Sequence, residues 1–184
     1  LSLLGSYPYS ELDFAKVDLQ REVTRGTPEV IYSPGKTPAQ IAAIAAELRD
    51  NGSNVLATRL DPAAYEAVSA ILPGGDYKPV SRTLTFMVKD PEPGVGTVAV
   101  VTAGTSDIPV AEEAAVTSEF LGNRTERVFD VGVAGLHRLF GRLDALREAR
   151  VIITVAGMEG ALPSVVAGLV KAPVIAVPTS ISYG

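Results

Sequence analysis

The segment 98–115 constrains the fold more than any other part of the chain. It begins with the apolar run Val98-Ala-Val-Val, continues through the small polar loop Thr102-Ala-Gly-Thr-Ser-Asp, and then takes on a helical pattern. A continuous apolar run is typical of a strand buried on both faces. Small residues, hydroxyls and backbone N–H groups at a helix N-terminus are favourable surroundings for an anion such as a phosphate. The segment therefore predicts a buried strand that leads into an anion-binding loop.

The same construction returns after the apolar run 151–155, where the loop Ala156-Gly-Met-Glu-Gly-Ala-Leu-Pro-Ser follows. Strands are expected at 97–101, 126–129, 151–155 and 173–177, alternating with helices at 109–121, 136–148 and 162–170. This alternation predicts an α/β fold with a doubly wound parallel sheet, flavodoxin-like, in the strand order 2-1-3-4. Ligands bind such sheets beyond the carboxyl ends of strands 1 and 3, where the winding reverses. The topology alone thus brings the two loops together and points to a nucleotide-type ligand.

The stretch Asp90-Pro-Glu-Pro-Gly-Val-Gly is the strong linker signal. It separates a small N-terminal α/β domain, residues 1–92, from a nucleotide-binding domain, residues 97–184. Within the first domain we expect an irregular or helical arm over 7–26, a capped helix from Thr37-Pro-Ala-Gln to about Gly52, a strand at 54–58, a helix from Asp61-Pro62 to Pro73, and a half-exposed strand over 82–88.

Composition narrows the classes of partner. The formal net charge is −5 and no basic patch stands out, which argues against a nucleic-acid partner. No apolar run approaches the roughly 18 residues of a membrane span, and no signal peptide is visible. The chain has no cysteine and one histidine, which excludes disulfides and thiolate sites within it and argues against protein-ligated zinc. We expect a cytoplasmic enzyme with no membrane partner.

Polar residues of the two loops are the leading candidates for ligand binding. Thr105, Ser106 and Asp107 can bind a phosphate and a ribose hydroxyl, although ordinary N-capping of the next helix favours the same residue types. Glu159 is the acidic residue of an otherwise apolar, glycine-rich loop. It can act as an acid or base or position a cationic ring, and the alternative is a solvated glutamate stabilised by the helix dipole.

Small residues and isolated cations complete the candidate set. The loop glycines can let backbone approach a ligand, and tight turns explain them nearly as well. Arg59 and Arg82 stand at or beside predicted strand ends, where they can meet a phosphate or carboxylate or simply be solvated. Lys36 lies in Ser33-Pro-Gly-Lys-Thr-Pro, which is similar to a phosphate loop but lacks its Gly-x4-Gly-Lys-Thr spacing, and Thr37-Pro38 serves better as a helix start. His137 is more simply a packing or surface histidine. The further candidate binding residues are Gly104, Ala134, Gly157, Met158, Gly160, Lys36 and Arg59.

Taken together, these motifs closely resemble the LarB family and, more distantly, the PurE aminoimidazole ribonucleotide carboxylases. The resemblance covers nearly the whole chain. It is carried by Ala99-Val-Val-Thr-Ala-Gly-Thr-Ser-Asp, Asp130-Val-Gly-Val-Ala-Gly-Leu-His-Arg-Leu, Val155-Ala-Gly-Met-Glu-Gly-Ala-Leu-Pro-Ser, Ile175-Ala-Val-Pro-Thr-Ser and, in the first half, Pro28-Glu-Val-Ile-Tyr-Ser-Pro-Gly-Lys-Thr.

The resemblance implies an activity at the start of nickel-pincer nucleotide synthesis. LarB proteins carboxylate C5 of the pyridinium ring of nicotinic acid adenine dinucleotide with CO2 and hydrolyse its phosphoanhydride. The products are pyridinium-3,5-biscarboxylic acid mononucleotide and AMP. The family depends on a divalent metal such as Mg2+, and its members are similar to PurE in forming octamers, so we expect a homo-oligomer.

The resemblance also implies roles for residues. Glu159 matches the active-site glutamate of the family, which implies the base that removes the C5 proton, and residues 105–107 match the phosphate- and ribose-binding loop of PurE relatives. The family uses a cysteine thiolate as nucleophile, about forty residues beyond the equivalent of Glu159, so we expect the natural protein to continue past Gly184.

Two alternatives stay open. A PurE-type carboxylase is disfavoured because its Ser-Ala-His-Arg segment is replaced by Gly132-Val-Ala-Gly. A non-catalytic nucleotide-binding module is the other, and the absence of cysteine favours it.

Overall fold

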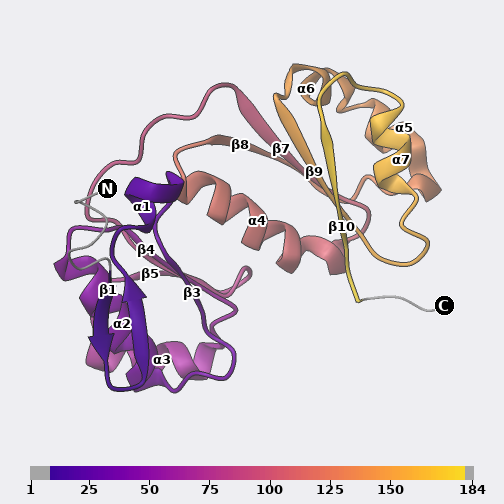
Figure 1. The fold of residues 1–184 in the computed structure, drawn as a ribbon. Coiled ribbons are helices and arrows are strands. Elements are labelled where there is room, and N and C mark those ends of the chain that lie inside the picture. The colour runs from indigo at the N-terminus through magenta and orange to yellow at the C-terminus, as the bar shows by residue number, and fades with distance from the viewer. Residues whose placement is uncertain (1–8, 181–184) are drawn as a thin grey trace. The chain divides into compact units, whose positions relative to one another are not determined.

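The computed structural model describes residues 9–180 of the 184-residue chain. The chain divides into two compact units between Asp90 and Pro91, and each unit has its own sheet and hydrophobic core. The units are described separately below and are coloured by residue number in Figure 1.

The second unit contains the predicted parallel sheet. Its strands run in the order β10-β9-β7-β8, all parallel, which is 2-1-3-4 when the four are numbered along the chain. The predicted fold class and strand order are therefore confirmed. Ala99, Val100 and Val101 are completely buried, as the continuous apolar run indicated. The strands are β7 (Thr97–Thr102), β8 (Arg124–Val128), β9 (Val151–Ala156) and β10 (Val174–Pro178).

Helices cover both faces of this sheet (Figure 1). The helix α4 (Ile108–Phe120) packs on one face through Ala111 and Ala115, against Val100 and Val155. On the other face, three short helices bury a second core around Leu139, Leu146, Leu162 and Ile152. They are α5 (Leu136–Phe140), α6 (Leu143–Glu148) and α7 (Leu162–Ala167).

Two helix predictions in this unit are wrong in extent. The single helix expected over 136–148 is broken into α5 and α6 at Gly141 and Arg142. Glycine is unfavourable inside a helix, and here its N–H closes the last turn of α5 by bonding the carbonyl of His137. The helix expected to reach Val170 ends at Ala167, where Gly168 closes α7.

The first unit is a four-stranded mixed sheet in the order β3-β4-β6-β5. β3 and β4 are parallel and are connected along the chain by the helix α2, whereas β6 is antiparallel to both β4 and β5. The predicted capping box is confirmed, since Thr37 Oγ1 accepts from the Gln40 N–H and Gln40 Oε1 accepts from the Thr37 N–H. The elements are β3 (Val30–Tyr32), α2 (Pro38–Asp50), β4 (Val55–Thr58), α3 (Pro62–Ile71), β5 (Asp76–Lys78) and β6 (Thr83–Phe86).

Two expectations for this unit are corrected. The arm over 7–26 is not irregular: it forms a β-hairpin, β1 (Tyr9–Leu12) with β2 (Ala15–Asp18), followed by the short helix α1 (Arg21–Arg25). Tyr7 and Pro8 lie outside the described residues. The strand expected to be half-exposed is buried at all four positions of β6, because it lies between β4 and β5 rather than at an edge. Among residues 9–180, no helix combines the length and the apolar character needed to cross a membrane.

Candidate active site at the carboxyl ends of the parallel strands

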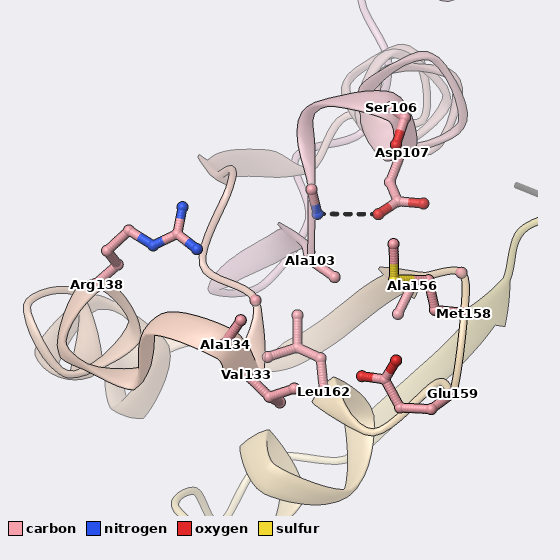
Figure 2. Close-up of a pocket in the computed structure, with 13 residues that line it drawn as sticks. Ala103, Ser106, Asp107, Val133, Ala134, Arg138, Ala156, Met158, Glu159 and Leu162 are labelled. Carbon is pink, nitrogen blue, oxygen red and sulfur yellow. Dashed lines mark hydrogen bonds between the residues drawn. The ribbon is translucent and has the colours of Figure 1, made fainter. Parts of the chain in front are cut away.

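A pocket of about 380 Å³ lies where three parallel strands end in the second unit. Figure 2 shows its lining. The loops that follow β7, β8 and β9 all contribute, which is the position expected for a ligand in a doubly wound sheet. The pocket residues are Ala103, Gly104, Ser106, Asp107, Gly132, Val133, Ala134, Arg138, Ala156, Gly157, Met158, Glu159 and Leu162.

The loop after β7 is fixed by a buried carboxylate. Residues 105–107 form a single 3-10 turn, and Asp107 is only 4% exposed. Its Oδ2 accepts a hydrogen bond from the Gly104 N–H at 3.0 Å, and its Oδ1 accepts one from Thr179 Oγ1 at 2.8 Å. The Asp107 side chain makes no capping bond to α4. It therefore organises the loop, and the side chain left exposed at the pocket is Ser106.

The loop after β9 has an unusual backbone. Met158 has φ +49° and Gly160 has φ +61°, and the Gly160 N–H closes the turn on the Gly157 carbonyl at 2.9 Å. A methionine in the left-handed region is strained by roughly 1 kcal/mol. The turn carries Glu159 at its apex, exposed, with no hydrogen bond or ion pair to another described residue. Its carboxylate is therefore available to a ligand.

The helix α5, which follows β8 and its loop, supplies a cation that the sequence analysis missed. Arg138 lines the pocket from α5, and its Nη1 lies 2.7 Å from Oδ2 of Asp130. Asp130 has φ +58°, and its N–H donates to Oγ1 of the buried Thr102. The sequence does contain a signal that could have identified Arg138, because it is a basic residue in the first turn of the helix that follows a loop at the switch point. The nearby His137 is exposed and does not line the pocket.

The loops after β7 and β8 are held together where their backbones approach closely. The Gly132 N–H donates to the Ala103 carbonyl at 2.9 Å, and a Cβ on Gly132 would lie 2.6 Å from that oxygen. Gly104 differs, because its φ of −131° suits any residue and a Cβ there would meet nothing closer than 3.8 Å. The fold requires glycine at 132, whereas at 104 its absent side chain leaves room in the pocket.

The pocket combines an apolar floor with charges at its rim. In Figure 2, Glu159 and Arg138 lie on opposite sides, with Ala134 and Leu162 between them. Such a floor suits a flat ring, the carboxylate suits a cation or a proton, and the guanidinium suits an anion. The geometry can thus hold a substrate that carries positive and negative charge.

The chemistry of the donor set bears on Mg2+. Among the described residues, no group of three His, Cys, Asp or Glu side chains is placed to hold a metal. Asp107 uses both carboxylate oxygens within the protein, and Asp130 pairs with Arg138, which leaves Glu159. Mg2+ is commonly held by one or two carboxylates together with substrate phosphates. The pocket therefore offers one carboxylate without a protein partner, and Mg2+ would fit it only where the phosphates of a bound ligand supply further oxygen ligands.

The predicted binding residues do not all lie in one place. Seven of them meet in this pocket: Gly104, Ser106, Asp107, Ala134, Gly157, Met158 and Glu159. Thr105 is exposed beside it, and Gly160 shapes its loop, but neither lines it. Lys36 and Arg59 belong to the first unit, where they line a different pocket.

Comparisons with known proteins agree with this division into units. Residues 9–89 match the family model described as LarB/PurE-like N-terminal domain, and residues 97–183 match the model described as AIR carboxylase. The chain belongs to the LarB family. It is also 43% identical over 177 residues to the uncharacterized protein MJ0165 of Methanocaldococcus jannaschii, an alignment that covers 92% of this chain and 69% of that protein.

Membership in the LarB family relates the second unit to PurE and gives it the fold of a carboxylase family. The pocket at the ends of β7, β8 and β9 lies entirely inside the AIR carboxylase match. The chain is thus of a carboxylase type, and the pocket is its candidate active site.

Proposed function

We propose that this LarB family member carboxylates C5 of the pyridinium ring of nicotinic acid adenine dinucleotide and cleaves its phosphoanhydride, giving the biscarboxylated mononucleotide and AMP. The observation that carries the proposal is the placement of Glu159 at the mouth of an apolar pocket at the switch point. A pyridinium is flat and cationic, so it matches an apolar floor beside an unpaired carboxylate.

The rest of the pocket suits the nucleotide part of such a substrate. Gly104 leaves space for a phosphate to approach the loop, where the Ser106 hydroxyl can donate a hydrogen bond. Arg138 can attract a substrate carboxylate or phosphate without losing Asp130 as its partner. When bound with the diphosphate, Mg2+ would neutralise its charge and assist its hydrolysis.

The proposed role of Glu159 is that of a base. An electron-poor ring attacks CO2 only after a nucleophile adds to it and makes C5 enamine-like. The C5–carboxyl bond then forms, Glu159 takes the C5 proton, and departure of the nucleophile with its electron pair restores the aromatic ring. In the LarB family the nucleophile is a thiolate, and residues 1–184 contain no cysteine.

The activity test uses the full-length natural protein with nicotinic acid adenine dinucleotide, bicarbonate and Mg2+, with products read by mass spectrometry. We expect the dicarboxylated pyridinium mononucleotide and AMP. Glu159→Gln should abolish carboxylation while substrate binding persists, and Glu148→Gln, an exposed glutamate of α6 outside the pocket, should match the wild type. An unchanged dinucleotide that still binds would refute the carboxylase proposal and favour a nucleotide-binding module.

A second candidate is a carboxylase of aminoimidazole ribonucleotide, which the AIR carboxylase match favours. Against it, the loop after β8 offers Gly132-Val-Ala-Gly where PurE has Ser-Ala-His-Arg, and Gly132 has no room for a side chain. The same assay with aminoimidazole ribonucleotide in place of the dinucleotide separates the two. Its turnover by the natural protein would establish this second function.

A further inference from the structure

The first unit contains a second pocket, of about 330 Å³, to which the proposed reaction assigns no role. It lies at the carboxyl ends of the parallel strands β3 and β4, where one connection leads from β3 to α2 and another leads from β4 to α3. Ser33 and Lys36 line it from the first connection, and Arg59 and Asp61 from the second. Arg82 completes it from the residue that precedes β6. Ligand pockets of α/β proteins occur at this end of parallel strands.

Positive charge is concentrated here although the protein as a whole is acidic. Lys36, Arg59 and Arg82 face Asp61 as the pocket's single carboxylate, whereas the chain carries a net charge of −5. The Arg82–Asp61 pair is long, 3.4 Å, and its side chains are 50% and 70% exposed, so the attraction is weak. Three cations from three segments therefore surround a space that suits an anion.

Tyr32 contacts two of the three cations. Lys36 Nζ donates to the Tyr32 carbonyl at 2.8 Å, which is a neutral acceptor. Arg59 stands over the Tyr32 ring, 5.8 Å from its centroid. Both interactions orient the cations beside the pocket.

The backbone under two of the cations is strained. Arg59 has φ +54° and Arg82 has φ +51°, values that glycine or asparagine adopts more readily than arginine. β4 and β6 are antiparallel and pair Ala57 with Leu84, and extending this register by two residues places Arg59 opposite Arg82. The Leu60 N–H donates to the Arg82 carbonyl at 2.8 Å. Strained residues of this kind cluster at ligand-binding positions.

A buried hydroxyl at the same pocket lacks a partner. Ser33 is 5% exposed, and its Oγ makes no hydrogen bond within the described part of the chain. An unsatisfied buried hydroxyl is unusual and calls for a group that can pair with it. The N-terminus of the 13-residue helix α2, which begins directly after Lys36 and Thr37, adds a positive dipole end.

We propose that this pocket binds a phosphate group, held by Lys36, Arg59 and Arg82 and accepting a hydrogen bond from the Ser33 hydroxyl. The phosphate can be inorganic or part of a nucleotide, and the chemistry that recognises it is the same. All residues of this pocket belong to the first unit, whereas the active-site pocket is lined by residues of the second unit.

The test is a titration of the ¹⁵N-labelled full-length natural protein with inorganic phosphate at constant low ionic strength, in which the amide chemical shifts are followed. We expect saturable shifts at Gly35, Lys36, Leu60 and Asp61. Loss of one charge-assisted contact should weaken binding about tenfold in Arg82→Gln and in Lys36→Gln. Lys16→Gln removes one charge from the same unit at an exposed hairpin position outside the pocket, and it should bind as the wild type does.

Two further readings keep the test decisive. If Arg82→Gln unfolds, its amide signals lose their chemical-shift dispersion, and the comparison of affinities then rests on Lys36→Gln. That substitution should leave the fold intact, because the Lys36 side chain makes one hydrogen bond, to the Tyr32 carbonyl. A second arm uses AMP: tighter binding with additional shifts identifies a nucleotide, and equal affinity identifies the phosphate group alone. Absence of saturable shifts at these amides, or equal affinity in all variants, would overturn the proposal. Shifts at Gly104 and Gly157 report the active-site pocket separately.

Discussion

Thr179, the first residue after β10, donates a hydrogen bond to Asp107, 72 residues earlier in the chain. Asp107 in turn accepts from the Gly104 N–H, so one buried carboxylate joins the end of the edge strand β10 to the pocket loop after β7. The loop geometry thus depends on a strand that is not its neighbour in the sheet.

Removing this carboxylate should destabilise the second unit. Asp107→Ala leaves the Gly104 N–H and the Thr179 hydroxyl without partners, so we expect a loss of about 2–3 kcal/mol in the free energy of unfolding. Asp107→Asn can accept from Gly104 and donate to Thr179, so it should lose about 1 kcal/mol or less. Urea unfolding followed by circular dichroism measures both, and equal losses would contradict this assignment of the bonds.

Two glycines of the pocket should respond differently to alanine. Gly132→Ala places a Cβ 2.6 Å from the Ala103 carbonyl oxygen, so we expect about 1–3 kcal/mol of destabilisation from overpacking. Gly104→Ala meets nothing closer than 3.8 Å, so thermal stability should be nearly unchanged. Its added methyl group should instead weaken dinucleotide binding, measured by calorimetry. Unchanged affinity in Gly104→Ala would show that the ligand does not approach this loop.

Arg138 should contribute to ligand affinity. Its guanidinium lines the pocket, and loss of a charge-assisted hydrogen bond to an anionic substrate corresponds to about tenfold in affinity. We expect this weakening for Arg138→Gln in a direct binding titration. Arg147→Gln, an exposed arginine of α6 outside the pocket, is the matched control and should bind normally.

Arg127 should be a stability determinant of the second unit. Its guanidinium bonds Glu119 and Glu112, which ties β8 to α4, and the Glu119 hydrogen bond is the main cause of its raised pKa. Arg127→Lys cannot reproduce this forked geometry, so we expect a loss of about 1 kcal/mol, reduced because the side chains are partly exposed. High salt should narrow the difference, and a salt-independent difference would speak against the ion pairs.

Tyr77 should make the first unit sensitive to alkaline pH. Burial, and then the negative charge of Asp61, raise the pKa of Tyr77 above its ordinary 10.0, while its hydroxyl donates to the Leu60 carbonyl at 2.7 Å. Because the folded state favours the protonated form, this stabilisation is complete below pH 10.0 and is lost as the pH rises through the folded-state pKa.

The variant pair Tyr77→Phe and Tyr65→Phe checks this. Tyr65 stacks on Tyr77 with centroids 4.2 Å apart, and its hydroxyl makes no hydrogen bond with a described residue, so Tyr65→Phe keeps the stack and the bond. Tyr77→Phe should lose about 1 kcal/mol and the alkaline step in stability, read by tyrosinate absorbance and unfolding. An alkaline step that persists in Tyr77→Phe would assign it to another group.

The sequence predicted the architecture of the second unit because the alternation of strands and helices admits few topologies. It also predicted that the loops holding Ser106 and Glu159 meet, since both follow strands at the switch point. It did not reveal the hairpin at Tyr9–Asp18, whose two four-residue strands are too short and too exposed for a clear alternation. The strands β3 and β5, each of three residues, were not predicted for the same reason.

Individual roles within the site were less accessible. That Asp107 turns inward to Gly104 and Thr179 depends on a strand far along the chain, so local spacing contains no trace of it. Arg138 was missed because it stands inside a helix rather than in a loop. The left-handed backbone of Met158 could not be predicted, since methionine rarely adopts it, whereas aspartate, as at Asp130, is one of the residue types that adopt it more often.

The bond between Thr179 and Asp107 has a consequence for the order in which the protein matures. During synthesis Asp107 leaves the ribosome 72 residues ahead of its partner, so the pocket loop can reach its final form only when β10 has joined the sheet. A nascent chain that stops before residue 179 holds every pocket-lining residue, yet lacks the contact that fixes them. A ligand that recognises the ordered pocket therefore reports that β10 has joined the sheet and that Thr179 has reached Asp107.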